Sequence, residues 1–157
     1  MSVQWEFSGY TTYEERYPGL GSSKKYRSSI GWVDVYSYSL KRADWAGGSS
    51  DPAFAAHFQT TVDDVQQLAL SGDYSELEMG PVQDVEIAGQ PFRTVTFKLA
   101  SKGLRLQSMT FVTALQGRLL KYRMSFVAPV PADVQDIVRK FIEDNLRARA
   151  SKRTARA

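Results

Sequence analysis

Side chains that most often carry chemistry are sparse in this sequence, and His57 is its only histidine. Any Ser–His or Thr–His relay would therefore have to use His57. It directly precedes Phe58 in a segment with helical periodicity, and Asp64 follows about two turns later on the same side. No Gly-x-Ser-x-Gly sequence accompanies it. We interpret His57 as a partly exposed structural histidine.

Acidic residues form two pairs with the spacing of a β-strand, Glu76 with Glu78 and Asp84 with Glu86. Alternate residues of a strand point to one side, so either pair could bind a divalent cation or act as an acid and a base. Neither pair has a neighbouring histidine or the pattern of a calcium loop. We interpret them as solvated acids of edge strands, which also discourage aggregation. The sequence predicts no metal ion, no cofactor and no catalytic residue.

Two further kinds of site are excluded by composition and spacing. The sequence contains no cysteine, which excludes thiol catalysis, disulfide bonds, and zinc or iron–sulfur sites built on thiolates. The glycine-containing segment 19–24 ends in a lysine, as a phosphate-binding loop does. It lacks the Gly-x-x-x-x-Gly-Lys-Ser/Thr spacing and a helix that opens directly after it, so we do not interpret it as such a loop.

Basic residues are concentrated at the C-terminal end. The formal net charge is +3, from 20 basic and 17 acidic residues among 157. Five basic residues follow Asp144 without any acid, so the rest of the chain has 15 basic against 17 acidic residues, a net charge of −2. We predict a single α+β domain over residues 1–146, and a basic tail over 147–157 that is partly disordered or extends a helix. The near-neutral body disfavours nucleic acid as a partner.

Apolar runs are only a few residues long, so the sequence predicts no transmembrane segment. No signal peptide begins at Met1. If a targeting segment has been removed, the protein is periplasmic or otherwise exported. If none has been removed, it is cytoplasmic.

Local patterns predict a mainly antiparallel sheet of about six strands, flanked by two main helices as an α/β/α sandwich. The first strands are expected at 3–8, 22–28 and 32–40, and a short one at 74–77. Within 32–40 both alternating faces carry apolar residues, which favours a strand covered on both sides.

Two helices and a meander of strands complete the expected order. The first helix starts with an N-cap acid and a first-turn proline, Asp51-Pro52, and ends at a glycine, Gly72. Residues 81–127 form four consecutive strands with turns at 88–90, 102–103 and 116–117. A closing amphipathic helix begins at Ala132.

The register of this meander decides which side chains share a face. A two-residue turn at 102–103 would place Phe97 opposite Ser108 and separate two apolar groups. A one-residue offset places Phe97 opposite Met109 and unites the apolar residues on one face. We therefore predict an odd-length loop or a bulge near Gly103.

The turn at 116–117 then pairs Phe111 with Tyr122 by a regular two-residue loop. The predicted core face, which one helix could cover, consists of Val95, Phe97, Leu99, Met109, Phe111, Leu120, Tyr122, Met124 and Phe126. The opposite face combines hydroxyls with cations and predicts a small-anion site formed by Thr96, Lys98, Thr110, Lys121 and Arg123. The alternative is that these are ordinary side chains of a solvated sheet face.

This order of elements, with Ile87-Ala88-Gly89 at the first turn of the meander, resembles the Mog1/PsbP-like group of α/β/α sandwiches over residues 5–146. It is also similar to small bacterial proteins of unknown function, in segments 20–26, 33–38 and 119–123. The resemblance implies a binding or assembly role, with partners in that group as different as a small GTPase and a photosystem. It also implies export, which is frequent among the bacterial relatives.

Together these observations predict a non-enzymatic binding or accessory domain that recognises a protein or a small anionic ligand. It would present the hydroxyl–cation face or the tyrosine-rich segment 10–26. The alternative is a small hydrolase or transferase that uses His57 or the Asp84/Glu86 pair. Homodimerisation through a sheet edge is left open.

Overall fold

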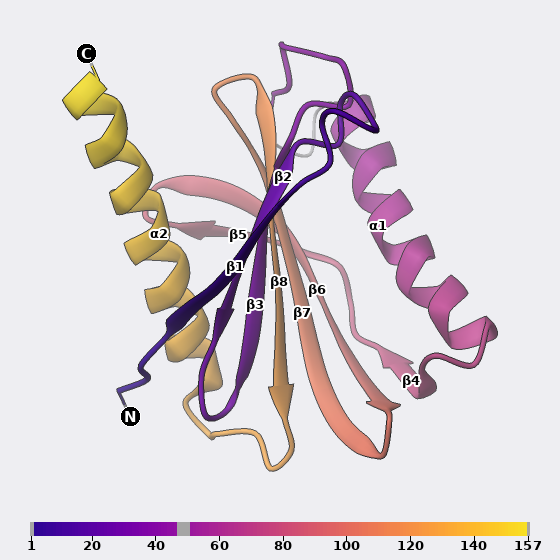
Figure 1. Cartoon of the computed structure of the whole chain (residues 1–157). Coiled ribbons are helices and arrows are strands. Elements are labelled where there is room, and N and C mark those ends of the chain that lie inside the picture. Colours follow the sequence, from indigo (N-terminus) through magenta and orange to yellow (C-terminus); the bar gives the residue numbers. More distant parts are fainter. Residues whose placement is uncertain (1, 47–50, 157) are drawn as a thin grey trace.

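One antiparallel sheet with a helix on each face makes up the part of the protein that the structure describes (Figure 1). The computed structural model describes residues 2–46 and 51–156, with the side chains up to Ser151. The predicted α/β/α sandwich is confirmed, with eight strands in place of about six. Within the described ranges, no helix is both long and apolar enough to cross a membrane.

Strand order in the sheet is β1-β2-β3-β8-β7-β6-β4, and β5 pairs with β6 beside β4. The strands are β1 (Glu6–Thr12), β2 (Ser22–Arg27), β3 (Gly31–Tyr38), β4 (Ser75–Met79), β5 (Gln83–Ile87), β6 (Gln90–Ser101), β7 (Leu104–Leu115) and β8 (Arg118–Val127). The predicted meander is β5 to β8, and β3 joins it by pairing with β8. The register is irregular in both outer strands, between Phe7 and Gly9 in β1 and between Ser75 and Glu78 in β4.

Helix α1 (Pro52–Leu70) begins as its sequence predicts. The Asp51 carboxylate caps it by accepting a hydrogen bond from the Ala53 backbone N–H at 2.9 Å. An apolar stripe then faces the sheet, and its buried members are Phe54, Phe58, Val62 and Val65. This stripe holds α1 against one face of the sheet, called here the α1 face.

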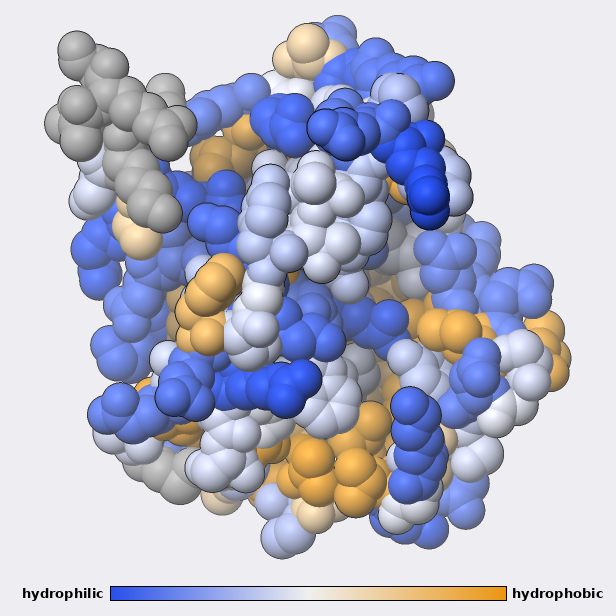
Figure 2. Space-filling view, in the orientation of Figure 1, coloured by the Kyte–Doolittle hydropathy of each residue, from blue (hydrophilic) through white to orange (hydrophobic). Residues whose placement is uncertain are grey.

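Helix α2 (Val134–Arg156) covers the other face, called here the α2 face (Figure 1). Its buried residues are Val134, Ile137, Val138, Phe141 and Ile142. The helix continues through the basic segment as far as Arg156, and Ala157 lies outside the described residues. Hydrophilic side chains cover the outer side of α2, at the left of Figure 2.

Two apolar layers result, one on each face of the sheet. The layer below α1 contains Val95, Phe97, Leu99, Leu106, Val112 and Leu119 of the sheet. The layer below α2 contains Val33, Val35, Met109, Phe111, Tyr122, Met124 and Phe126. The central strands are therefore buried on both sides, as strands covered by helices on both faces must be.

The predicted bulge near Gly103 is wrong. Residues 102–103 form a two-residue turn, because Ser101 pairs with Leu104 and Phe97 lies opposite Ser108. Lys102 and Gly103 have φ of 51° and 79°, the two positive values that suit a tight hairpin between twisted strands. The register at 116–117 is as predicted, with Phe111 opposite Tyr122.

The single predicted core face is wrong for the same reason. Val95, Phe97 and Leu99 point toward α1, whereas Met109 and Phe111 point toward α2. Uniting all apolar residues on one face is the right rule only for a sheet with one buried face. Here each face has its own helix, so apolar residues are stable on either side.

Gly103→Ala tests the positive φ of the hairpin. An added Cβ at Gly103 meets no atom within 4 Å, so its cost comes from the left-handed backbone and we expect a loss of about 1–2 kcal/mol in the free energy of unfolding. Urea denaturation measures it. Gly9→Ala is the matched control, since Gly9 is equally open but has no positive φ, and we expect a change within about 0.5 kcal/mol. Equal losses in the two variants would contradict the assigned turn.

Candidate functional site

The five residues of the predicted anion site do not lie together. Thr96 pairs with Met109 and Lys98 with Gln107, which places Thr96 and Lys98 on the α2 face. The other three, Thr110, Lys121 and Arg123, lie on the α1 face. The prediction that all five residues share one face is therefore wrong. The pairing of β6 with β7 differs by one residue from the predicted register, which turns the β6 side chains to the other face.

On the α1 face, β3 and β8 extend beyond the cover of α1 and form the floor of two cavities that share Tyr36. The first, called here the Lys121 pocket, has a volume of about 520 Å³. Its lining includes Tyr13, Tyr36, Tyr38, His57, Asp64 and Lys121. The second has a volume of about 460 Å³ and contains Arg123.

Lys121 is the cation at the base of the Lys121 pocket. Its Nζ lies 4.6 Å from the centre of the Tyr36 ring and 5.8 Å from that of Tyr38, both in the range of cation–π contacts. Within the described part of the chain, no carboxylate oxygen lies within 4 Å of this Nζ. Burial lowers the pKa of the Lys121 amine, and the charge of Arg123 lowers it further.

His57 lies in the wall of the same pocket and is bonded to a tyrosine. Its Nε2 shares a hydrogen bond of 2.5 Å with the Tyr38 hydroxyl, and the Trp45 ring is 6.1 Å away. Burial lowers the pKa of His57 to about 4, with a contribution from the charge of Lys121, so the ring is neutral at pH 7. The neutral ring therefore positions Tyr38.

The hydroxyls nearest to His57 on α1 are used within the helix. Thr60 donates to the Ala56 carbonyl at 3.2 Å, and Thr61 donates to the Phe58 carbonyl at 2.7 Å. A nucleophile relay needs a hydroxyl bonded to the histidine and an acid that orients it. In the described residues the hydrogen-bond partner of His57 is a tyrosine.

The rim of the Lys121 pocket is apolar on one side and acidic on the other. Leu20 and Leu40 line it with 45% and 38% of their surfaces exposed, which is high for leucine. Asp64 is exposed on α1 across the opening. From the tyrosine-rich segment, Tyr13 lines the pocket and bonds to the Ser23 hydroxyl at 3.0 Å, whereas Tyr10 remains exposed.

Arg123 in the neighbouring cavity already has a partner. Its Nη2 donates to the Tyr74 hydroxyl at 2.7 Å. Beside it, Asp34 forms an ion pair of 3.6 Å with Lys25, although burial still raises the pKa of Asp34. Thr110 is buried on the α1 face of the sheet. Of the three predicted residues on this face, Lys121 alone faces an open apolar pocket.

The acidic pairs serve surface contacts. Asp84 accepts a hydrogen bond from Arg93 Nε at 2.9 Å, and Glu76 pairs with Arg105 at 3.1 Å. The Glu76–Arg105 pair is exposed on both sides, and in the Asp84–Arg93 pair the carboxylate is exposed, so both contribute little to stability. In the ranges that the structure describes, no group of three or more potential metal-ligating side chains occurs.

Sequence reasoning located Lys121 but missed the residues around it. Tyr36 and Tyr38 reach the site because β3 pairs with β8, which places Tyr36 opposite Lys121. The alternation within residues 32–40 did place both tyrosines on one face. The paired residues of β3 and β8 are more than 80 positions apart in the sequence, so no local pattern indicates that Tyr36 lies beside Lys121.

Fold and site together define an α/β/α sandwich with a ligand-sized pocket where one helix leaves the sheet uncovered. No protein-family model matches the chain, and neither does any curated protein.

The solved structures that are similar to it include the following two. One is cyanobacterial PsbP (CyanoP) from Synechocystis sp. PCC 6803, 17% identical, with 92% of this chain and 79% of that chain covered and a TM-score of 0.47. The other is a protein of unknown function, PA94 from Pseudomonas aeruginosa, described as a putative regulator. It is 11% identical over 90% of this chain and 80% of that chain, with a TM-score of 0.47. They are of the two kinds that the sequence resemblance named, and no residue's role is taken from them.

His57→Gln tests the neutral state of the buried ring. Between pH 6.5 and about 4 the unfolded chain binds a proton that the folded chain does not, so His57 makes the free energy of unfolding fall as pH decreases through this window. The slope is below the limit of about 1.4 kcal/mol per pH unit, because the half-buried ring is partly screened.

Urea denaturation of both proteins across this window gives the comparison. The carboxylates titrate in both, so the difference in slope belongs to His57. We expect the variant to lose less stability than the wild type on acidification. Parallel curves for the two proteins would contradict the lowered pKa.

Proposed function

We propose that the protein is a non-enzymatic binding domain whose Lys121 pocket takes a small ligand with one anionic group and an apolar body. The single observation that carries this proposal is the Lys121 amine, which lies half-buried between two tyrosine rings without a carboxylate within 4 Å in the described residues. An amine that has lost part of its water and has no carboxylate beside it is stabilised by an incoming anion.

Charge and shape divide the ligand into two parts. Its anionic group would contact Lys121 Nζ, because hydrogen bonds to a charged group contribute about 1.5–3 kcal/mol. Its apolar body would lie against Leu20 and Leu40, whose exposed surface would then be buried at about 25 cal/mol per Å². Asp64 at the rim would repel a second anionic group, which favours a monoanion.

A volume of about 520 Å³ suits a small organic molecule. Tyrosine rings on the floor favour a flat aromatic body, since ring pairs add about 0.5–1.5 kcal/mol beyond their buried area. An aromatic carboxylate therefore combines the features that the pocket selects. A hydrolase or transferase built on His57 or on Asp84 and Glu86 has no comparable support from the geometry.

The test uses naphthoate as the probe and naphthylmethanol as its uncharged counterpart. We expect naphthoate to shift the NMR signals of Tyr36, Tyr38 and His57, and to bind more tightly than naphthylmethanol in calorimetry. Lys121→Met keeps the aliphatic stem and removes the charge, so the affinity for naphthoate should fall about ten-fold or more.

Lys98→Met is the matched control, because Lys98 is exposed on the opposite face and its loss changes the net charge equally. Folding does not confound the result, since removing a desolvated charge should leave the unfolding midpoint unchanged or raise it. Equal affinity for naphthoate in the two variants, or shifts centred away from β3 and β8, would refute the proposal.

A further inference from the structure

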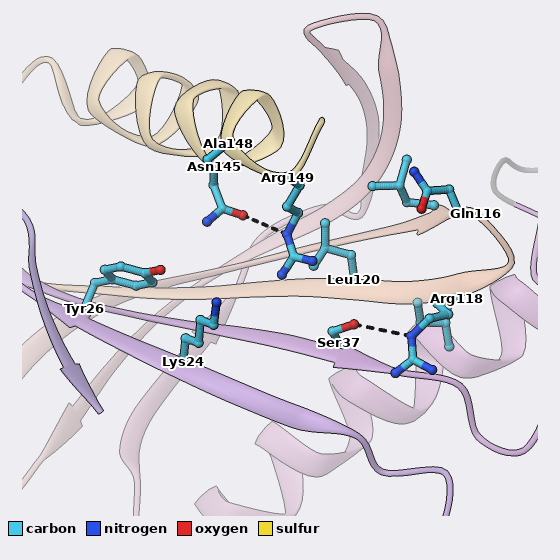
Figure 3. A pocket seen from close by; sticks show the side chains of 11 residues that line it. Lys24, Tyr26, Ser37, Gln116, Arg118, Leu120, Asn145, Ala148 and Arg149 are labelled. Atoms are coloured by element: carbon cyan, nitrogen blue, oxygen red, sulfur yellow. Dashed lines mark hydrogen bonds between the residues drawn. The ribbon is translucent and has the colours of Figure 1, made fainter. Parts of the chain in front are cut away.

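A second cavity lies on the α2 face, at the end of the sheet where the C-terminal half of α2 extends past it (Figure 3). Its volume is about 360 Å³. It is separate from the Lys121 pocket, because the two cavities lie on opposite faces of β8. Its lining comes from β2, β3, β7, β8, the turn at 116–117 and α2.

Three cations, each from a different one of these elements, line this cavity. Lys24 comes from β2, Arg118 from the start of β8, and Arg149 from α2 (Figure 3). Among its lining residues, all of which the structure describes, there is no aspartate or glutamate. Like charges brought together in a concave site repel one another, and the cavity walls concentrate their field. The arrangement is therefore complementary to an anion.

Within the described residues, the hydrogen-bond partner of the Arg149 side chain is uncharged. Its Nε donates to Asn145 Oδ1 at 3.2 Å, and the Tyr122 hydroxyl donates to the same oxygen at 2.6 Å. Both Asn145 and Tyr122 are uncharged, and Asn145 lines the cavity. Figure 3 shows the guanidinium extending from the helix toward Leu120 and into the space above Lys24.

Arg118 on the other side of the cavity also has a neutral partner. Its Nε lies 3.5 Å from the Ser37 hydroxyl, at the limit of a hydrogen bond. The charge of Glu14 acts on it from a distance, since that carboxylate is already bound by the backbone N–H groups of Gly19 and Gly21 at 3.0 and 2.7 Å. The guanidinium therefore retains N–H donors for a ligand.

We propose that this cavity binds the phosphate group of a phosphorylated small molecule, held by Lys24, Arg118 and Arg149. Two guanidinium forks match the oxygens of a phosphate, and their two positive charges complement its two negative charges better than the single charge of a carboxylate. Ser37 and the amide of Gln116 add neutral hydrogen-bonding groups to the same lining.

Binding there would join parts of the molecule that are otherwise held by few contacts. A phosphate touching Arg149 and Lys24 would link the last turns of α2 to β2, at a level where the helix lies beyond its buried stripe. A ligand that binds the folded chain alone raises its stability in proportion to the logarithm of its concentration. Binding can therefore be measured both as heat in calorimetry and as a rise in the unfolding temperature.

The experiment uses pyrophosphate as the probe, with calorimetry and thermal unfolding as readouts at low ionic strength. We expect saturable binding with a rise in Tm, both weakened by added salt. Arg118→Gln and Arg149→Gln should each lower the affinity about ten-fold or more. Arg147→Gln is the matched control, because Arg147 is 72% exposed on the same helix and pairs with Asp144.

Arg149→Gln could disturb folding, because Arg149 is bonded to Asn145, which is in turn bonded to Tyr122. Lys24→Gln removes a cation of the cavity that takes no part in these contacts, so it tests the site independently of such a defect. Lys121→Met should leave the affinity for pyrophosphate unchanged, which separates this site from the Lys121 pocket. No saturable binding, or an equal loss in Arg147→Gln, would overturn the proposal. Citrate binding as tightly as pyrophosphate, or a single-stranded oligonucleotide binding while pyrophosphate does not, would overturn the assignment to a phosphorylated small molecule.

Discussion

The structure depends on burying three long central strands, β6, β7 and β8, from both sides at once. In β7 every residue from Ser108 to Ala114 is buried, whichever way it points. A strand in that position needs two apolar layers, and each layer needs its own helix. The stripe of α1 and that of α2 meet this need separately, so each helix buries one of the two apolar layers.

Both cavities follow from where this double cover ends. Neither helix is broad enough to cover the whole sheet, so β2 and β3 have an uncovered stretch beside α2, and β3 has another beside α1. Strand β8 supplies a cation to each cavity because its side chains alternate, with Lys121 toward α1 and Arg118 toward α2. The alternation of side chains along β8 therefore places one cation on each face of the sheet, next to the apolar layer of that face. The two proposed sites are connected through this strand.

Sequence reasoning succeeded where local chemistry decides the structure. The N-cap at Asp51 and the turn glycines specify their elements within a few residues, so the order of strands and helices was predictable. The register at 102–103 was not, because the burial of a second face depends on a distant helix. That error moved Thr96 and Lys98 to the wrong side, while Thr110 stayed with Lys121 and Arg123 because the turn at 116–117 was predicted correctly.

The outer strands bear on self-association. At one edge β1 is interrupted between Phe7 and Gly9, and at the other β4 and β5 divide the edge of β6 into two short segments. A second chain that tried to extend the sheet would find only short runs of regular, unpaired backbone on either side. Continuous edge-to-edge pairing is thus disfavoured by the backbone itself, without the help of charged side chains.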